Sequence, residues 1–288
     1  MRVVTTIALA AWLVSADGLV AIVENSASKI RTFEVGTGRT PVVLMHGYGS
    51  SPEAWLPFAQ TIQIGAHQRF VFPEAPERAP EVSIPPDGPV GGRAWWRLDL
   101  ASYRAPGNDS GKGLPDMSRA RPAGLTRSVD TIRLLIADLE RRAEYQRGDV
   151  ILGGFSQGAM IAADVAFRTN EPLRALVLLS GTALDEASWT AAMPSRRGLR
   201  VFIAHGRRDD VLPFASSERL QEAMRAAGLQ VTWVPFDGGH EVPAEVVVAL
   251  NAFLASVNAI GSARASVTVG ATIGASAGAI GVPPTPVR

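Results

Sequence analysis

Short apolar runs alternate along the chain with longer segments in which apolar positions recur every three or four residues. Runs typical of buried strands cover residues 41–45, 69–73, 150–152, 175–179, 200–204 and 230–235. Segments typical of amphipathic helices cover residues 53–64, 125–144, 159–167, 185–193, 214–227 and 244–257. This alternation predicts an α/β fold, with a mostly parallel central sheet and helices on both of its faces.

The connection over residues 74–122 departs from this regular pattern. It is rich in proline and glycine and exceeds ordinary connection lengths, so we expect a functional loop or lid-like region. Residues 17–257, which include this connection, read as one domain. A chain of 288 residues with 47% hydrophobic residues is large enough to bury the core of one such domain.

The first 16 residues have the composition of a targeting segment. Arg2 precedes an apolar run, and Val14-Ser15-Ala16 is typical of a small-residue cleavage site. Residues 1–16 therefore resemble a secretory signal peptide, which favours an exported or periplasmic location over a cytoplasmic one. The alternative is a first apolar strand, because residues 19–23 are also strand-like. The run is too short for a transmembrane helix.

Residues 258–288 have a different composition, dominated by Gly, Ala, Ser, Thr and Val. Small side chains bury little area per ordered residue, which predicts a disordered tail. Gly270, Gly274 and Gly278 have the spacing of a membrane helix-pairing face. The uncharged stretch is short and interrupted by glycine, so we expect no stable membrane span.

Charge and cysteine content exclude several classes of function. The formal net charge is +1, which gives no electrostatic case for binding nucleic acid. The chain contains no cysteine, which rules out disulfides, a thiol nucleophile and thiolate metal sites.

Two pentapeptides match the pattern G-x-S-x-G, one centred on Ser156 and one on Ser276. A nucleophile elbow requires a strand before the serine, small flanking residues, and a helix after it whose N–H groups face a developing oxyanion. Ser156 follows the apolar run 150–152, has Gly154 and Gly158 around it, and precedes a helical segment. Ser276 lies in low-complexity sequence without either element. Ser156 is therefore the candidate nucleophile.

A serine hydroxyl needs a general base, and the base needs an orienting carboxylate. His240 lies in a loop after the 230–235 strand and before the last helix, a suitable position for the base. Asp209 and Asp210 follow the 200–204 strand, and both are candidates for the acid. The chain order is nucleophile, acid, histidine, as in α/β-hydrolases.

Five segments, in order over about residues 41–256, resemble the carboxylesterase/phospholipase branch of the α/β-hydrolases. They are LMHGYGSSPEAW, PEAP…GGRAWWRLDL, GFSQGAM, HGRRDDVLPF and GGHEVP. This branch includes acyl-protein thioesterase-like enzymes. The resemblance implies that Asp209 is the acid, because the family's acid stands four residues after the histidine of H-G-x-x-D. It also implies that the backbone N–H groups of Tyr48 and Gln157 form the oxyanion hole.

Other aromatic and histidine residues have two interpretations each. Trp95 and Trp96 either line the substrate pocket or anchor the long loop on the core. For His46 we expect a structural role in holding the oxyanion loop, and His205 is expected to pack beneath the acid loop. His67 is expected at the surface.

The sequence thus predicts a serine hydrolase that cleaves carboxylic esters of small molecules through an acyl-enzyme, with no metal or other cofactor. A thioesterase or lysophospholipase would use the same residues. A non-catalytic binding protein on a hydrolase scaffold is the alternative of another class. Nothing in the sequence indicates the oligomeric state.

Overall fold

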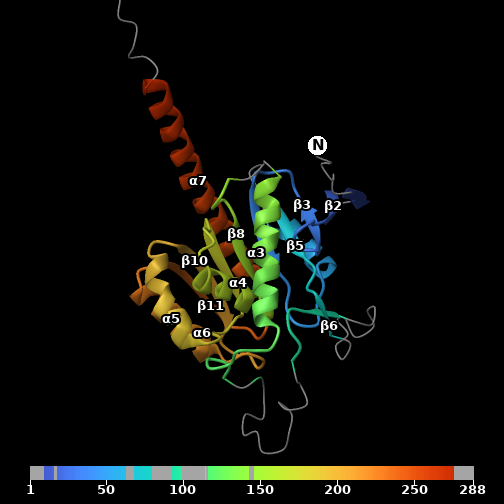
Figure 1. The fold of residues 1–288 in the computed structure, drawn as a ribbon. Coiled ribbons are helices and arrows are strands. Elements are labelled where there is room, and N and C mark those ends of the chain that lie inside the picture. Colours follow the sequence, from blue (N-terminus) through green and yellow to red (C-terminus); the bar gives the residue numbers. More distant parts are fainter. Residues whose placement is uncertain are drawn as a thin grey trace, which may run out of the picture.

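The structure is a computed structural model that describes residues 10–15, 18–62, 68–79, 92–98, 114, 116–142 and 146–275. A nine-stranded sheet forms the centre of this part of the chain, in the order β1-β2-β3-β5-β4-β8-β9-β10-β11 (Figure 1). The strands are β1 Ala10–Ser15, β2 Gly18–Glu24, β3 Arg31–Val35, β4 Thr40–Met45, β5 Gln68–Pro73, β8 Ile151–Phe155, β9 Ala175–Leu179, β10 Arg200–Gly206 and β11 Gln230–Phe236. Strands β5, β4, β8, β9, β10 and β11 pair in parallel, while β1, β2 and β3 extend the sheet in antiparallel.

Helices cover both faces of the sheet, which confirms the predicted fold class. They are α1 Leu56–Thr61 after the short helix η1 Glu53–Trp55, α3 Leu125–Arg141, α4 Gln157–Arg168, α5 Glu186–Ala192, followed by η2 Met193–Arg196, α6 Phe214–Ala226 and α7 Ala244–Ala275. Side chains alternate along each strand, so Val43 and Met45 of β4 pack with α3 and α4, whereas Val42 and Leu44 pack with α1 and α7. The core therefore has two layers, one on each side of the sheet.

Three strands were not expected from the pattern of apolar residues. β3 carries Thr32 and Glu34 at buried positions, so it lacks the apolar alternation that marks a strand. β6 Glu77–Ala79 and β7 Gly92–Ala94 lie within the predicted loop region 74–122 and pair with each other in antiparallel. Their pairing depends on contacts between residues far apart in the chain, which local patterns do not report.

Both ends of the described chain contain regular structure where the sequence suggested other states. Ala10–Ser15, inside the candidate signal peptide, forms edge strand β1 against β2. Helix α7 runs through Ala275, beyond the expected end at residue 257 (Figure 1), so the first part of the predicted disordered tail is helical in this structure. Within the described residues, no helix is both long and apolar enough to cross a membrane.

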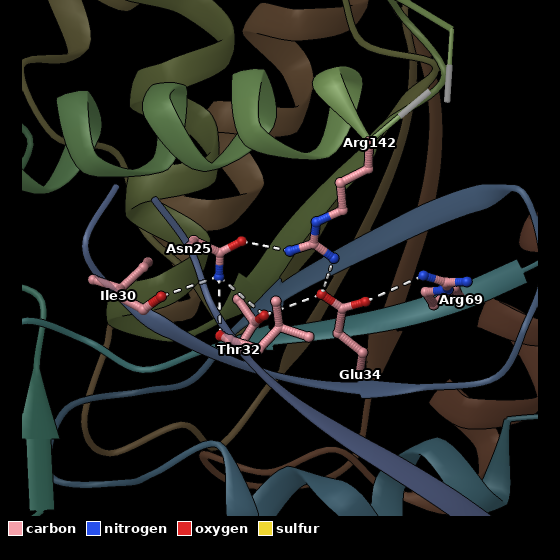
Figure 2. Close-up of polar contacts among 7 residues, drawn as sticks. Asn25, Ile30, Thr32, Glu34, Arg69 and Arg142 are labelled. Atoms are coloured by element: carbon pink, nitrogen blue, oxygen red, sulfur yellow. Dashed lines mark hydrogen bonds and ion pairs between the residues drawn. The ribbon is translucent and has the colours of Figure 1, made fainter. Parts of the chain in front are cut away.

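A buried polar network joins the antiparallel edge of the sheet to the end of α3 (Figure 2). The Glu34 carboxylate, 3% exposed, accepts hydrogen bonds from Arg142 Nη1 at 2.6 Å and Arg69 Nη1 at 3.3 Å. Asn25 Oδ1 accepts from Arg142 Nη2 at 2.5 Å, and Asn25 Nδ2 donates to Thr32 Oγ1 at 3.1 Å. The charge on Glu34 is thus buried with two cations beside it.

Candidate active site

Ser156 lies at a tight turn between β8 and α4. Its backbone has φ 54° and ψ −117°, a conformation that a non-glycine residue adopts only under constraint from its surroundings. A Cβ atom at Gly158 would lie 2.2 Å from the carbonyl oxygen of Met45, and one at Gly154 would lie 2.6 Å from the same oxygen. The turn therefore needs glycine on both sides of the serine, and it leaves Ser156 at the N-terminus of α4.

The structure brings His240 and Asp209 together. Nδ1 of His240 lies 2.8 Å from Oδ2 of Asp209. Because the carboxylate can only accept, this nitrogen donates, and Nε2 of His240 is left as the basic atom. The neighbouring Asp210 is exposed, so the geometry favours Asp209 of the two candidate acids.

The Asp209 side chain has no exposed surface, yet it stays ionised. Burial alone would raise the pKa of the carboxyl. Hydrogen bonds from His205 and His240, with a further one from the backbone N–H of Leu212, outweigh burial and hold the pKa of Asp209 well below its usual range. The carboxylate can therefore orient the imidazole of His240 while remaining charged.

The loop after β4 carries the predicted oxyanion residue Tyr48. This loop is held by β7, since Gly49 N donates to Arg93 O and Arg93 N donates to Ser50 O, both at 2.8 Å. A Cβ atom on Gly92 would lie 1.9 Å from Gly49 O, so the two backbones are in direct contact. The loop that carries Tyr48 is thus positioned by a segment more than forty residues away in the chain.

The ring of His46 holds the same loop through hydrogen-bond contacts. Its Nδ1 atom lies 2.8 Å from Gly47 O, and its Nε2 atom accepts a hydrogen bond from Ala75 N at 3.3 Å. Burial lowers the pKa of His46 to about 4, with a smaller contribution from the positive charge of Arg93. His46 is therefore a neutral imidazole that bridges two loops, in keeping with the structural role expected for it.

Gln157 contributes a buried side chain as well as its backbone. Its Oε1 atom accepts from Trp95 N, and its Nε2 atom donates to Trp96 O, both at 2.8 Å. Trp95 in turn donates from Nε1 to His46 O at 2.9 Å. Gln157, the residue after the candidate nucleophile, therefore holds the backbone of Trp95 and Trp96 beside the site.

The two tryptophans have different places in the structure. Both are almost fully buried. Trp96 lines the cavity beside Ser156, whereas Trp95 packs against His46 with ring centroids 5.6 Å apart. His67 lies outside the described residues.

A cavity of about 550 Å³ opens at Ser156 and His240. Most of its lining is apolar: Ala54, Trp55, Phe58, Trp96, Leu98, Leu114, Met117, Phe155, Met160, Val211 and Val242. Gly47, Tyr48, Ser50 and Gln157 complete the wall near the serine. Within the described residues, no Asp, Glu, Lys or Arg lines this cavity, so it suits an uncharged apolar group.

Sequence reasoning missed most of the apolar lining and the side-chain role of Gln157. Trp55 and Phe58 stand three residues apart just after the oxyanion loop, and their ring centroids lie 5.1 Å apart. That spacing places both on one face of a short helix, which is a signal available in the sequence. The bonds of Gln157 to Trp95 and Trp96 join residues about sixty positions apart, and no local pattern indicates them.

Comparisons with known proteins identify the family and its relatives. Residues 37–258 match the family model described as Phospholipase/Carboxylesterase. Acyl-protein thioesterase 1 of Mycosarcoma maydis is 28% identical over 193 residues, which cover 63% of this chain and 73% of that protein.

Solved structures give the same result for the fold. The crystal structure of esterase PE8 covers 78% of this chain and 97% of its own, with a TM-score of 0.63 and 27% identity. The Bacillus cereus carboxylesterase structure covers 79% of this chain and 94% of its own, with a TM-score of 0.55 and 19% identity.

Proposed function

Because this chain belongs to the phospholipase/carboxylesterase family of α/β-hydrolases and is a carboxylesterase- or thioesterase-type hydrolase, we propose that it cleaves carboxylic esters with Ser156, His240 and Asp209 as its catalytic triad. One observation carries this proposal: His240 Nδ1 lies 2.8 Å from Asp209 Oδ2 beside a cavity that Ser156 also lines. The arrangement leaves Nε2 of His240 free to act as a base toward the cavity.

The reaction follows from these positions. His240 Nε2 takes the proton from Ser156 Oγ as that oxygen attacks the ester carbonyl. The backbone N–H groups of Tyr48 and Gln157 stabilise the oxyanion, and helix α4, whose N-terminus begins at Gln157, adds its dipole. His240 then protonates the leaving alcohol, and it afterwards activates the water that releases the acid from Ser156.

The cavity indicates the kind of acyl or alcohol group that the enzyme accepts. A volume of about 550 Å³ with an apolar lining favours esters that carry a medium-sized uncharged hydrocarbon group. Charged groups near the carbonyl would lose hydration without gaining a partner there. We therefore expect kcat/KM to rise with the acyl chain length of p-nitrophenyl esters until the cavity is filled.

The test is covalent labelling by a fluorophosphonate probe together with p-nitrophenyl ester hydrolysis. Ser156→Ala should abolish labelling and lower kcat/KM by at least about 10³-fold, since the nucleophile is lost. Ser276→Ala is the matched control, because Ser276 lies in the second G-x-S-x-G pentapeptide, and it should leave both signals unchanged. Labelling that survives in Ser156→Ala would overturn the proposal.

A thioesterase is the second candidate, because the relatives identified by sequence include acyl-protein thioesterases. Oxyesters and thioesters share the acyl-enzyme step and differ in the leaving group. Comparing kcat/KM for an oxyester and a thioester with the same acyl chain separates the two activities. If the wild-type protein neither reacts with the probe nor hydrolyses either ester, a non-catalytic binding role replaces both.

A further inference from the structure

The carboxylate of Asp209 is contacted by two histidines on the same oxygen. Oδ2 lies 2.8 Å from Nδ1 of His240 and 3.1 Å from Nε2 of His205. The other oxygen, Oδ1, accepts backbone hydrogen bonds from Val211 at 2.9 Å and Leu212 at 2.8 Å. His240 belongs to the proposed triad, and Val211 and Leu212 belong to the acid loop itself. His205 is the remaining one of these four donors to the carboxylate.

The contacts of His205 define its tautomer. Its Nε2 atom faces two acceptors, Asp209 Oδ2 and the carbonyl oxygen of Leu212, both at 3.1 Å. Nε2 therefore carries the proton. Its Nδ1 atom is buried without a hydrogen-bond partner among the described residues, so a second proton there would have no acceptor. The Nε2–H of His205 is therefore shared between Asp209 Oδ2 and the carbonyl oxygen of Leu212.

The charged side chains near this cluster either have other partners or are exposed. Arg207 pairs with Asp237 and lies over the ring of Phe214, the first residue of α6. Arg208 donates to the carbonyl oxygen of Asp237, and Asp210 is exposed.

Other described residues beside the two histidines are apolar or paired. Glu241, next to His240, accepts from Gly239 N through Oε1. From the neighbouring strand β11, Pro235 is the register partner of His205, and from α6 the Phe214 ring packs on its edge. Within the described chain, the groups that offset burial and keep the Asp209 carboxylate ionised are therefore the two histidines and the backbone N–H of Leu212.

We propose that His205 is a positioning residue of the reaction: its Nε2–H holds the Asp209 carboxylate and shares the charge on Oδ2 with His240. This inference rests on the proposed triad. Because one oxygen serves both rings, the hydrogen bond from His205 limits how strongly Asp209 stabilises the His240 imidazolium. His205 thereby weakens the attraction of Asp209 for a proton on His240, compared with a carboxylate that has a single histidine partner.

The consequence is a defined shift in the pH profile. Without the His205 donor, the charge on Oδ2 is directed at His240 alone, and it stabilises a proton on that ring more strongly. Since the base must be neutral to accept the serine proton, the acid limb of kcat/KM moves to higher pH. We expect an upward shift of about half a pH unit or more, with roughly a tenfold fall in kcat/KM at neutral pH from the less restrained carboxylate.

The matched variants are His205→Gln and His205→Asn. The amide nitrogen of glutamine can occupy the place of Nε2 and keep the donor to Asp209, whereas the shorter asparagine places its amide near Nδ1. Both substitutions bury one amide in the same site, so their cost in stability is similar. His205→Gln should retain the wild-type acid limb and about a third or more of the activity, while His205→Asn should show the shift.

A thermodynamic cycle tests whether His205 acts through Asp209. In the Asp209→Asn background, His205→Asn should cause no further loss of kcat/KM, because the partner that transmits its effect has changed. Equal pH profiles for His205→Gln and His205→Asn, or an undiminished effect of His205→Asn in Asp209→Asn, would overturn the inference. If instead the wild type fails to hydrolyse esters or to react with the fluorophosphonate, the proposed triad itself is wrong.

Discussion

Gln157 donates a hydrogen bond from its side-chain Nε2 to the carbonyl oxygen of Trp96 at 2.8 Å, although the two residues are sixty-one positions apart. The same amide accepts from Trp95 N. The residue predicted to stabilise the oxyanion through its backbone thus also holds the wall of the substrate cavity through its side chain.

Replacing this amide should therefore destabilise the fold. Gln157→Met keeps the approximate volume but leaves Trp95 N and Trp96 O buried without partners, which should cost about 2–4 kcal/mol of unfolding free energy. Gln221→Met is the control, since Gln221 is also buried and its Oε1 has no partner among the described residues. Urea unfolding should show a clearly larger loss for Gln157→Met; equal losses would contradict the role of the amide.

The glycines of the elbow should tolerate no side chain. In Gly158→Ala the new Cβ would meet Met45 O at 2.2 Å, and neither backbone can move away cheaply. We expect a loss of at least about 3 kcal/mol, or failure to fold. Gly198→Ala is the comparison: its Cβ meets nothing within 4 Å, but φ is +81°, so about 1 kcal/mol is expected. Thermal unfolding of both variants measures the two losses in stability.

Burial of His46 should make the protein sensitive to acid. Its pKa falls to about 4 in the fold, against about 6.5 in the unfolded chain. Between these values the unfolded chain binds more protons, so stability falls as the pH decreases from about 6.5 to 4. The shift corresponds to roughly 3 kcal/mol.

His46→Gln isolates this contribution. The variant should be less stable at pH 7, because the bridge between Gly47 and Ala75 is altered, but its stability should depend less on pH between 6.5 and 4. Urea unfolding at pH 4.5 and pH 7 measures the difference. The pKa of the Asp209 carboxyl is also lowered in the fold, but this group changes the stability only at lower pH than His46 does. An unchanged slope in His46→Gln would mean that other groups cause the acid sensitivity.

The polar network at the edge of the sheet should also contribute to stability. Arg142→Ala leaves the buried Glu34 with the Thr32 hydroxyl and one cation, Arg69, and it frees Asn25 Oδ1, which should cost about 2 kcal/mol. Within helix α3, which ends just before Arg142, Arg133 forms ion pairs while its side chain is 45% exposed, and Arg133→Ala should cost less than about 0.5 kcal/mol. Comparable losses in the two variants would show that the network adds nothing beyond a surface ion pair.

The parts that the sequence predicted well depend on local patterns. The strand before Ser156 and the helix after it combine an apolar run, two glycines and a second apolar period, all within about twenty residues. The loops that carry Asp209 and His240 follow strands recognisable in the same way. Because parallel strands present their carboxyl ends at one edge of the sheet, the grouping of these loops could be anticipated.

The parts that the sequence did not predict depend on distant contacts. Strand β3 buries Thr32 and Glu34, and this becomes understandable only when Arg142 and Asn25 arrive from other segments. A position of His205 beneath the acid loop was expected. Whether His205 and His240 contact the same oxygen of Asp209 depends on the three-dimensional placement of the three side chains to within about an ångström. Residue type and spacing carry no information at that scale.

The pairing of β10 with β11 has a consequence for protein engineering. Gly206 is the register partner of Phe236, and a Cβ on Gly206 would lie 2.2 Å from Gly239 O, so the two loops leave the sheet in backbone contact. A slip of one residue would displace one loop by about 3.3 Å and break the bond between Asp209 and His240. Substitutions in the loop after β10 therefore belong at exposed positions such as Arg207, Arg208 and Asp210, while the lengths of both loops are best kept constant.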